Sequence, residues 1–314
     1  MPHRTPRRRC SASTPMPSAD DRRSLARLLS SILDAAPLEA QRLVRAPISH
    51  AHRVGFSGPP GAGKSTLISA WAQLPLAAGR SLGVLAIDPT SPLSSGSVLG
   101  DRIRMDAVAG HPDFYLRSVP SRATHGGLCP NVAALLDAFD AYQFDVVALE
   151  TVGVGQVDYA VRSLVDTFVL VLNPEGGDIV QAMKAGILEV AEIVVVGKAD
   201  LPAARRMARE VSGIVDLRRG TGWRPPVLEV AATLGTGLAE LDAAISAHRE
   251  LLATNSDADD RRRRRQRERL RGVLHAQAET LVDGLSGPDL DRSLAELHEG
   301  ATRRLAALRD HGDS

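Results

Sequence analysis

The chain carries one glycine-rich run whose residue types and spacing suit phosphate chemistry. It consists of Gly58, Pro59, Pro60, Gly61, Ala62, Gly63, Lys64 and Ser65, followed by Thr66, and it fits the pattern G-x-x-x-x-G-K-[ST]. In such loops the backbone N–H groups and the N-terminus of the following helix attract a polyphosphate. Lys64 would bridge the β- and γ-phosphates, and the Ser65 hydroxyl would bind Mg²⁺. The run predicts a nucleoside triphosphate site, whereas the alternative is a glycine-rich turn that binds nothing.

Two carboxylates follow apolar runs that could be neighbouring strands. Asp88 comes after residues 84–87, and Glu150 comes after residues 146–149. Ligands bind at the carboxyl edge of an open parallel sheet, so an acid there can help to hold Mg²⁺ or position water. Taken singly, each acid could equally be a solvated strand end or a helix cap. Together with the loop, they make Lys64, Asp88 and Glu150 the predicted catalytic residues.

Short apolar runs must form the strands that position these groups. They cover residues 54–57, 83–87, 114–119, 145–150, 168–172, 193–196 and 227–230. The runs are almost continuously apolar rather than alternating, which is typical of a parallel sheet covered by helices on both faces. The loop follows the first run directly and precedes a helical pattern, as a phosphate loop requires. The predicted fold class is therefore α/β, a doubly wound, mostly parallel sheet.

The chain divides into four predicted parts. Residues 1–23, rich in Arg, Pro and Ser, are expected to be a disordered tail, with an organellar transit peptide as the alternative. Residues 24–50 are expected to form a helical extension, because apolar side chains recur there at helical spacing. Residues 51–255 form the predicted phosphate-loop domain. Residues 256–314 are predicted to be a helical arm, whose apolar seams suit a partner helix or a second subunit.

Composition narrows the class of protein. The 314 residues include 38 Lys and Arg against 37 Asp and Glu, so the body has no general attraction to nucleic acid or to anionic membranes. The two cysteines stand alone, which argues against a disulfide scaffold or a thiolate zinc site. No run approaches the ~20 apolar residues of a membrane span, and we expect a cytoplasmic protein. The basic run at residues 261–271 is interpreted as a solvated helix face, with nucleic-acid binding as the alternative.

Three further segments resemble a known family. They are residues 88–105, residues 150–156, and Gly176, Gly177 and Asp178 with Lys184. With the phosphate loop, they are similar to the GTPases that accompany methylmalonyl-CoA mutase and related cobalamin-dependent acyl-CoA mutases. The resemblance covers residues 22–281 and implies a homodimeric GTPase of the SIMIBI type that binds GTP or GDP with Mg²⁺. It also implies a chaperone that gates the loading of adenosylcobalamin into such a mutase and protects the mutase.

The same resemblance implies roles for particular residues. The Mg²⁺ shell would consist of Ser65, Asp88, Asp101 and Glu150, with Asp88 and Asp101 in the first switch. The second switch would run through Gly155 and Gln156. The segment 176–184 would be a third switch that responds to the partner, since its paired glycines permit large backbone changes. Without the resemblance, those glycines would be interpreted as an ordinary loop after a strand.

Base recognition is expected in the run Gly197-Lys198-Ala199-Asp200, which follows the apolar residues 193–196. The Asp200 carboxylate can accept hydrogen bonds from guanine N1–H and N2–H₂, a pair that adenine lacks, and the Lys198 stem can stack on the ring. Gly197 stands where the family carries an asparagine that touches the base and braces the phosphate loop. Ala232 lies in a segment where the family carries Ser-Ala, so this chain also lacks a hydroxyl that would support the loop of Asp200. We expect a preference for GTP, with affinity reduced by roughly up to tenfold.

Three functions remain open on these residues. The first is the GTPase chaperone of a cobalamin-dependent mutase. The second is a metal-insertion GTPase, although its expected His-rich or Cys-rich loop is missing because the nine histidines are scattered. The third is a non-catalytic or weakly catalytic, nucleotide-gated binding module, which the glycine at position 197 keeps open. No arginine finger is evident in the sequence, so slow intrinsic turnover is expected.

Overall fold

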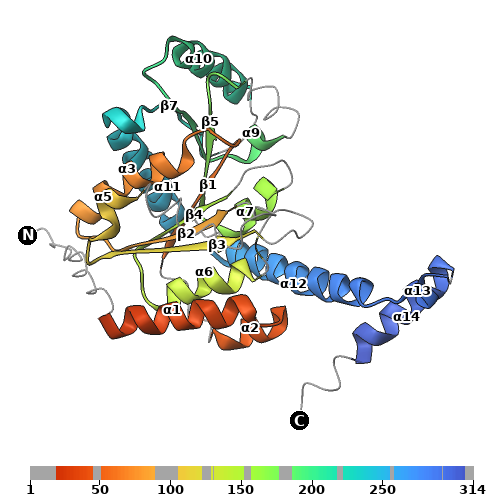
Figure 1. Ribbon diagram of the computed structural model, residues 1–314. Helices are drawn as coiled ribbons and strands as arrows, with labels where there is room; N and C mark the ends of the chain where they lie inside the picture. The colour runs from red at the N-terminus through yellow and green to blue at the C-terminus, as the bar shows by residue number, and fades with distance from the viewer. Residues whose placement is uncertain are drawn as a thin grey trace, which may run out of the picture.

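The structure is a computed structural model of the 314-residue chain. It describes residues 19–44, 51–88, 105–121, 129, 131–151, 157–176, 186–217, 222–254, 258–291 and 293–307. Figure 1 shows a central sheet between two layers of helices, with a long helix extending toward the C-terminus. In the described part of the chain, no helix combines the length and the apolar character that crossing a membrane would need.

Seven parallel strands form the sheet, in the order β3-β2-β4-β1-β5-β6-β7. The strands are β1 (His52–Ser57), β2 (Leu82–Asp88), β3 (Phe114–Pro120), β4 (Val146–Glu150), β5 (Thr167–Leu172), β6 (Ile193–Val196) and β7 (Val227–Glu229). Every residue of β1, β4, β5 and β6 is buried, whereas the edge strands β3 and β7 are partly exposed. This burial on both faces explains the continuous apolar runs, and the predicted fold class is confirmed.

Helices cover the two faces unequally. The first face packs against α3 (Lys64–Ala77), α5 (Asp106–Ala109) and α11 (Leu238–Thr254). The second packs against α1 (Ala19–Asp34), α2 (Pro37–Leu43), α6 (Val132–Ala141), α7 (Val157–Leu164), α9 (Ile187–Val190) and α10 (Pro202–Asp216). The short helix η1 (Ala232–Leu234) precedes α11. Each face of the sheet therefore has its own apolar core, and the loops at the strand ends are left to form sites.

The N-terminal helix α1 begins at Ala19, five residues before the predicted start. Asp20 and Asp21 lie in its first turn, where negative charge is favourable beside the helix dipole. Leu25, Leu29 and Ile32 are buried in the same apolar cluster as α6, so the predicted stripe packs on the sheet domain. The helix therefore includes the last five residues of the predicted tail, whereas residues 1–18 lie outside the described part of the chain.

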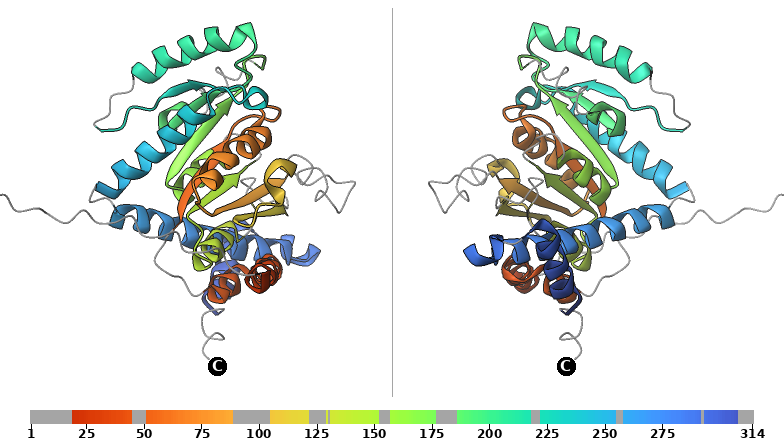
Figure 2. Two further views of the ribbon diagram at one scale, coloured as in Figure 1. Left: turned by 90° about the vertical axis from the view of Figure 1, so that its left-hand side faces the viewer. Right: turned by 90° about the vertical axis from the view of Figure 1, so that its right-hand side faces the viewer.

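The C-terminal helices are α12 (Ala258–Asp283), α13 (Gly287–Leu290) and α14 (Leu294–Ala307). Figure 2 shows α12 crossing below the sheet beside α1 and α2, and contacts join α12 to α2 and to α7.

The interpretation of residues 261–271 as a solvated face is wrong for one side of α12. Arg265 forms an ion pair with Asp166, and Arg269 forms one with Asp137. Arg261 donates to the carbonyl of Leu252 at 3.1 Å. These arginines recur every four residues and face the domain, whereas the exposed arginines of the run are Arg262, Arg263, Arg264, Arg267 and Arg271. The acidic partners are distant in sequence, so the run itself does not reveal this docking.

Candidate functional site

The glycine-rich run forms a loop between the end of β1 and the start of α3. Gly58, Gly61 and Gly63 have φ angles of +148°, +77° and +87°, which side chains rarely adopt. A Cβ atom on Gly58 would lie 2.0 Å from the carbonyl oxygen of Val171 in β5. The loop backbone therefore packs directly on the sheet, and its shape depends on glycine at this position.

Lys64 and Ser65 lie in the first turn of α3, and both are buried. The Lys64 ammonium donates to the carbonyl oxygens of Gly58 at 2.7 Å and Pro59 at 3.0 Å, so its side chain is folded against the loop. The Ser65 hydroxyl donates to Glu150 Oε1 at 2.5 Å. Thr66 is exposed. The structure thus brings an ammonium, a hydroxyl and a carboxylate together at the phosphate loop.

The two predicted carboxylates end neighbouring strands. Glu150 is the last residue of β4, in register with Phe56 of β1 and Ala86 of β2. Asp88 ends β2 two residues beyond that register, and it accepts a hydrogen bond from the Ser118 hydroxyl of β3. Glu150 is therefore central at the carboxyl edge, while Asp88 lies one strand further out.

Three hydroxyl residues that are not among the predicted site residues also lie at this edge. Ser118 holds Asp88, and the Thr151 hydroxyl donates to the Ser57 hydroxyl at 3.1 Å. The backbone N–H of Thr151 also donates to the Phe56 carbonyl at 3.2 Å, which links the residue after β4 to β1. Ser57 directly precedes the phosphate loop, and Thr151 directly follows Glu150. These positions next to predicted site residues are the sequence signal by which both could be found. Ser118 has no such signal, since it lies in β3, which is distant in the sequence from the phosphate loop and from Glu150.

The predicted base-reading loop follows β6, next to the phosphate loop. A Cβ atom on Gly197 would lie 3.1 Å from the Ala62 carbonyl oxygen, so a side chain at this position would contact the phosphate loop. Lys198 has a φ angle of +51°, and its ammonium pairs with Glu175 Oε2 at 2.8 Å. Asp200 is exposed. Ala232 begins η1, which contacts α3, the helix that follows the phosphate loop.

Several predicted residues lie outside the described part of the chain. They are Asp101, Gly155, Gln156, Gly177, Asp178 and Lys184. Gly176 is described, and its N–H donates to the Asn173 carbonyl at 3.3 Å. Their predicted roles in metal binding and switching stay predictions.

A second concentration of polar groups lies at the opposite, amino edge of the sheet. Arg53 is buried and its guanidinium contacts Asp137 at 2.7 Å and Asp140 at 2.6 Å. Burial alone would raise the pKa of Asp166, but Arg265 and His52 hold it below its usual value. None of these residues belongs to a site predicted from the sequence.

Two buried histidines continue this amino-edge cluster. The Thr167 hydroxyl lies 2.8 Å from His52 Nε2 and 2.8 Å from His248 Nδ1. Burial lowers the pKa of both histidines to about 4; Asp166 opposes this shift, and nearby arginines add to it. Both imidazoles are therefore neutral at pH 7.

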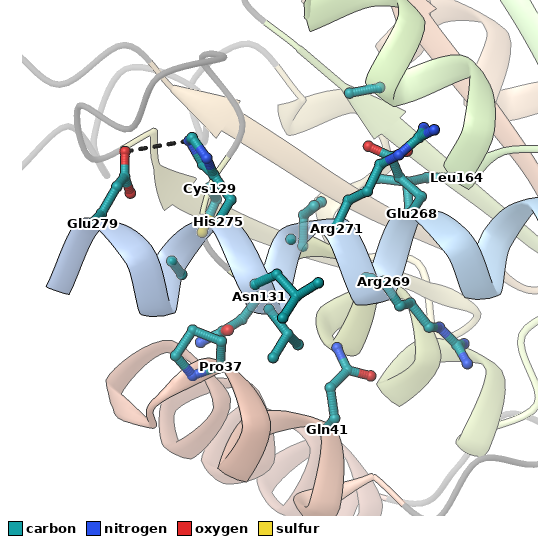
Figure 3. Close-up of a pocket in the computed structure, with 17 residues that line it drawn as sticks. Pro37, Gln41, Cys129, Asn131, Leu164, Glu268, Arg269, Arg271, His275 and Glu279 are labelled. Atoms are coloured by element: carbon teal, nitrogen blue, oxygen red, sulfur yellow. Dashed lines mark hydrogen bonds and ion pairs between the residues drawn. The ribbon is translucent and has the colours of Figure 1, made fainter. Parts of the chain in front are cut away.

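A cavity of about 640 Å³ lies between α2, α6, α7 and α12. Figure 3 shows Gln41, Asn131, Arg269 and His275 around it, with His275 Nε2 lying 3.4 Å from Glu279 Oε1. None of the predicted phosphate-, metal- or base-binding residues of the described chain lines this cavity.

Comparison with known proteins identifies a family. Residues 25–284 match the family model "Methylmalonyl Co-A mutase-associated GTPase MeaB". A putative GTPase of Pyrococcus abyssi is 39% identical over 281 residues, which cover 87% of this chain and 84% of that protein. The mitochondrial methylmalonic aciduria type A homolog of Mus musculus is 43% identical over 194 residues, covering 60% of this chain and 47% of that protein.

A solved structure supports the fold independently. The crystal structure of an LAO/AO transport system kinase superposes with a TM-score of 0.57 at 22% identity, covering 90% of this chain and 98% of that one. At that identity the likeness concerns the fold alone. The phosphate loop after β1, the carboxylate at the end of β4 and the match over residues 25–284 agree. The chain therefore belongs to the methylmalonyl Co-A mutase-associated GTPase MeaB family.

Proposed function

We propose that the chain hydrolyses GTP to GDP and phosphate with Lys64, Ser65, Glu150 and Asp88 as its working residues. Membership of a GTPase family makes GTP the substrate, and the assignment of these residues is our own. The observation that carries it is the Ser65–Glu150 hydrogen bond beside the Lys64 ammonium at the phosphate loop. A hydroxyl and a carboxylate held together there offer oxygen ligands next to the place where phosphates bind.

These oxygen donors fit Mg²⁺, which prefers hard oxygen ligands and is commonly bound through one or two side chains plus phosphate oxygens. We propose that Ser65 and Glu150 hold the ion and that Asp88 and Asp101 complete its shell. A bound Mg²⁺ would supply neutralisation of the charge on the phosphates. Side chains and backbone amides of this chain would stabilise the developing charge and recognise the base.

The chain's own groups account for the rest of the proposed reaction. Lys64 moves from the loop carbonyls to the phosphates when nucleotide binds, and it stabilises negative charge that develops as water attacks the γ-phosphorus. Glu150 orients the Ser65 hydroxyl, and the loop amides bind the remaining phosphate oxygens. Asp200 and Lys198 recognise guanine. Because we assign no arginine to this charge, slow turnover is expected until a partner orders the site.

We further propose that the partner is a cobalamin-dependent acyl-CoA mutase. The family description names methylmalonyl-CoA mutase, which supports this partner. In this proposal the GTPase acts as a chaperone that gates adenosylcobalamin loading and protects the mutase. Residues 256–314 would serve as a dimerisation arm in a cytoplasmic homodimer, and nucleic acid and membranes would not be partners.

A second candidate is a weakly catalytic, nucleotide-gated binding module. Gly197 favours it, because that residue offers no side chain to the Ala62 carbonyl nearby. In this candidate, nucleotide would bind and change the partner affinity, with little hydrolysis.

Phosphate release by the purified full chain tests both candidates. With GTP and Mg²⁺, the wild type should turn over slowly and faster with an acyl-CoA mutase, while Lys64→Ala should show no turnover in either condition. Arg206→Ala, on the exposed face of α10, is the control and should match the wild type. Turnover by Lys64→Ala at the wild-type rate would remove the phosphate loop from the mechanism. Binding of ATP as tightly as GTP in calorimetry would show that Asp200 does not read the base.

A further inference from the structure

Glu175 lies where the loop after β5 approaches the base-reading loop after β6. We propose that Glu175 is a positioning residue for guanine recognition, because it holds the Lys198 ammonium and thereby orients the Lys198 stem before nucleotide arrives. This inference rests on the proposed GTP site and adds a residue from outside the phosphate loop and the Gly197–Asp200 run.

The two loops are joined at two levels. β5 and β6 are neighbours, and Leu172 pairs with Val196 at their carboxyl ends. The N–H of Gly197 donates to the Leu172 carbonyl at 2.9 Å, which ties the backbones together. The Lys198 ammonium then contacts Glu175 Oε2 at 2.8 Å, which ties the side chains together. The loop after β5 is thus a direct support of the base-reading loop.

Glu175 is itself held by a local turn. Its N–H donates to Asn173 Oδ1 at 3.3 Å, and the N–H of Gly176 donates to the Asn173 carbonyl at 3.3 Å. An asparagine side chain that bonds the backbone two residues later stabilises a turn of this kind. The carboxylate therefore projects from a structured loop, which makes it a usable anchor for a flexible lysine.

Lys198 needs such an anchor because its backbone alone cannot orient its stem. The backbone is fixed, since Leu201 N–H donates to the Lys198 carbonyl at 2.9 Å and Ala199 N–H donates to the Val230 carbonyl at 3.2 Å. The four-carbon stem still has many rotamers, and a stem that stacks on a base must adopt one of a few of them. With glycine at 197, no neighbouring side chain from that residue restricts the stem. The Glu175 carboxylate supplies the restriction.

The size of the effect follows from exposure. The Lys198 and Glu175 side chains are 39% and 58% exposed. Ion pairs this exposed contribute little and are screened by salt. Removing the pair should therefore weaken nucleotide binding by about two- to fivefold at low salt, and by less at high salt. Phosphate binding should not change, because Glu175 does not contact the phosphate loop in any described interaction.

Calorimetry on the full chain with Mg²⁺ tests this proposal with GDP, GTP and inorganic tripolyphosphate. Glu175→Gln should weaken GDP and GTP alike by about two- to fivefold at about 50 mM salt and leave tripolyphosphate unchanged. The difference should shrink at about 500 mM salt. In turnover assays, KM for GTP should rise by the same factor while kcat stays constant. Glu210→Gln, which breaks the similarly exposed pair of Glu210 with Arg206 on α10, is the matched control and should have no effect.

A double-variant cycle separates positioning from a general charge effect. Lys198→Met keeps most of the stem and removes the ammonium, so adding Glu175→Gln to it should cause no further loss. Unchanged or tighter GDP binding by Glu175→Gln, an equal loss for tripolyphosphate, or a full loss in the Lys198→Met background would each overturn the inference. Failure of the wild type to bind any guanine nucleotide would instead overturn the proposed function, and this inference with it.

Discussion

The two edges of the sheet organise charge in opposite ways. At the carboxyl edge, Lys64, Ser65 and Glu150 lie together at the phosphate loop. Most of the residues of this site come from one short run of the sequence. At the amino edge, buried charges come from β1 and α6, and half-buried ones come from α12 and from Asp166 just before β5, segments far apart in the sequence. The carboxyl edge can therefore be recognised from a motif, whereas the amino edge exists only once the chain has folded.

The amino edge also differs in what its charges do. Three arginines, Arg53, Arg265 and Arg269, face three aspartates, Asp137, Asp140 and Asp166. Buried charges are tolerated when each has a partner, and they destabilise strongly when one partner is lost. We interpret this edge as the attachment of α12 to the sheet domain. The comparison predicts that changes at the amino edge alter stability and that changes at the carboxyl edge alter hydrolysis.

The strongest test of this separation is Arg53→Met. It should lower the free energy of unfolding by about 3–5 kcal/mol, because Asp137 and Asp140 lose their buried partner. Urea denaturation followed by circular dichroism measures this loss, and Arg206→Met on the exposed face of α10 is the control. Hydrolysis per folded molecule should change by less than about twofold. A loss of stability below about 1 kcal/mol would contradict a stabilising role for the buried ion pairs of Arg53.

Glu150→Gln tests the other edge. The substitution keeps the shape of the side chain and removes the charge that accepts the Ser65 hydroxyl, so kcat should fall by about 10²–10³-fold. The urea midpoint should stay close to that of the wild type, since one neutral acceptor remains for Ser65. Single-turnover phosphate release gives the rate. A variant that hydrolyses GTP normally would exclude Glu150 from the reaction.

Acid should destabilise the amino edge before it protonates most carboxylates. His52 and His248 have pKa values lowered to about 4 in the folded chain, against 6.5 when exposed. Between these values the unfolded chain binds more protons, so stability is complete above pH 6.5 and falls as the pH drops toward 4. Each histidine should cost about 2 kcal/mol between pH 7 and pH 5.

Urea titrations at pH 7 and pH 5 measure this loss, and His52→Gln provides the comparison. Glutamine can still bond to Thr167 but does not titrate, so the variant should lose about half as much stability on acidification. An equal loss in the variant and the wild type would show that other groups are responsible.

Gly197→Asn should have the smallest effect of these variants, and it tests whether residue 197 can brace the phosphate loop. An amide at this position would lie beside the Ala62 carbonyl and could donate to it, with a small shift of the phosphate loop. We expect GTP affinity to rise by up to about tenfold, as one added hydrogen bond allows. Calorimetry against Gly197→Ala, which adds only a Cβ, isolates the amide. Equal affinities for the two variants would mean that no brace forms.

Individual elements show how far the sequence predicted the fold. β6 covers residues 193–196, as predicted, because four apolar residues between polar neighbours leave little ambiguity. β1 begins at His52, two residues earlier than predicted. His52 and Arg53 are polar and lie outside the predicted apolar run, yet both are buried and contact Thr167, Asp137 and Asp140. Polar strand ends escape a hydrophobic pattern because only tertiary partners make their burial possible.

The candidate site shows the same division. Lys64, Ser65 and Glu150 were named from the sequence because a phosphate loop has a fixed spacing and a strand end has a fixed place in a parallel sheet. Ser118 and Glu175 were not named, since each acts through one side-chain contact with a residue on another strand or loop. Their residue types are common and carry no pattern.

The parallel α/β architecture, the phosphate loop and the family can therefore be predicted without a structure, because all three depend on local order along the chain: apolar runs, a glycine spacing and contiguous motifs. The tertiary structure decided which of the arginines in residues 261–271 dock, which polar residues are buried at the amino edge and which carboxylate holds Lys198. These features depend on pairs of charges that meet across long separations in sequence, and charge–charge contact is a matter of distance in space.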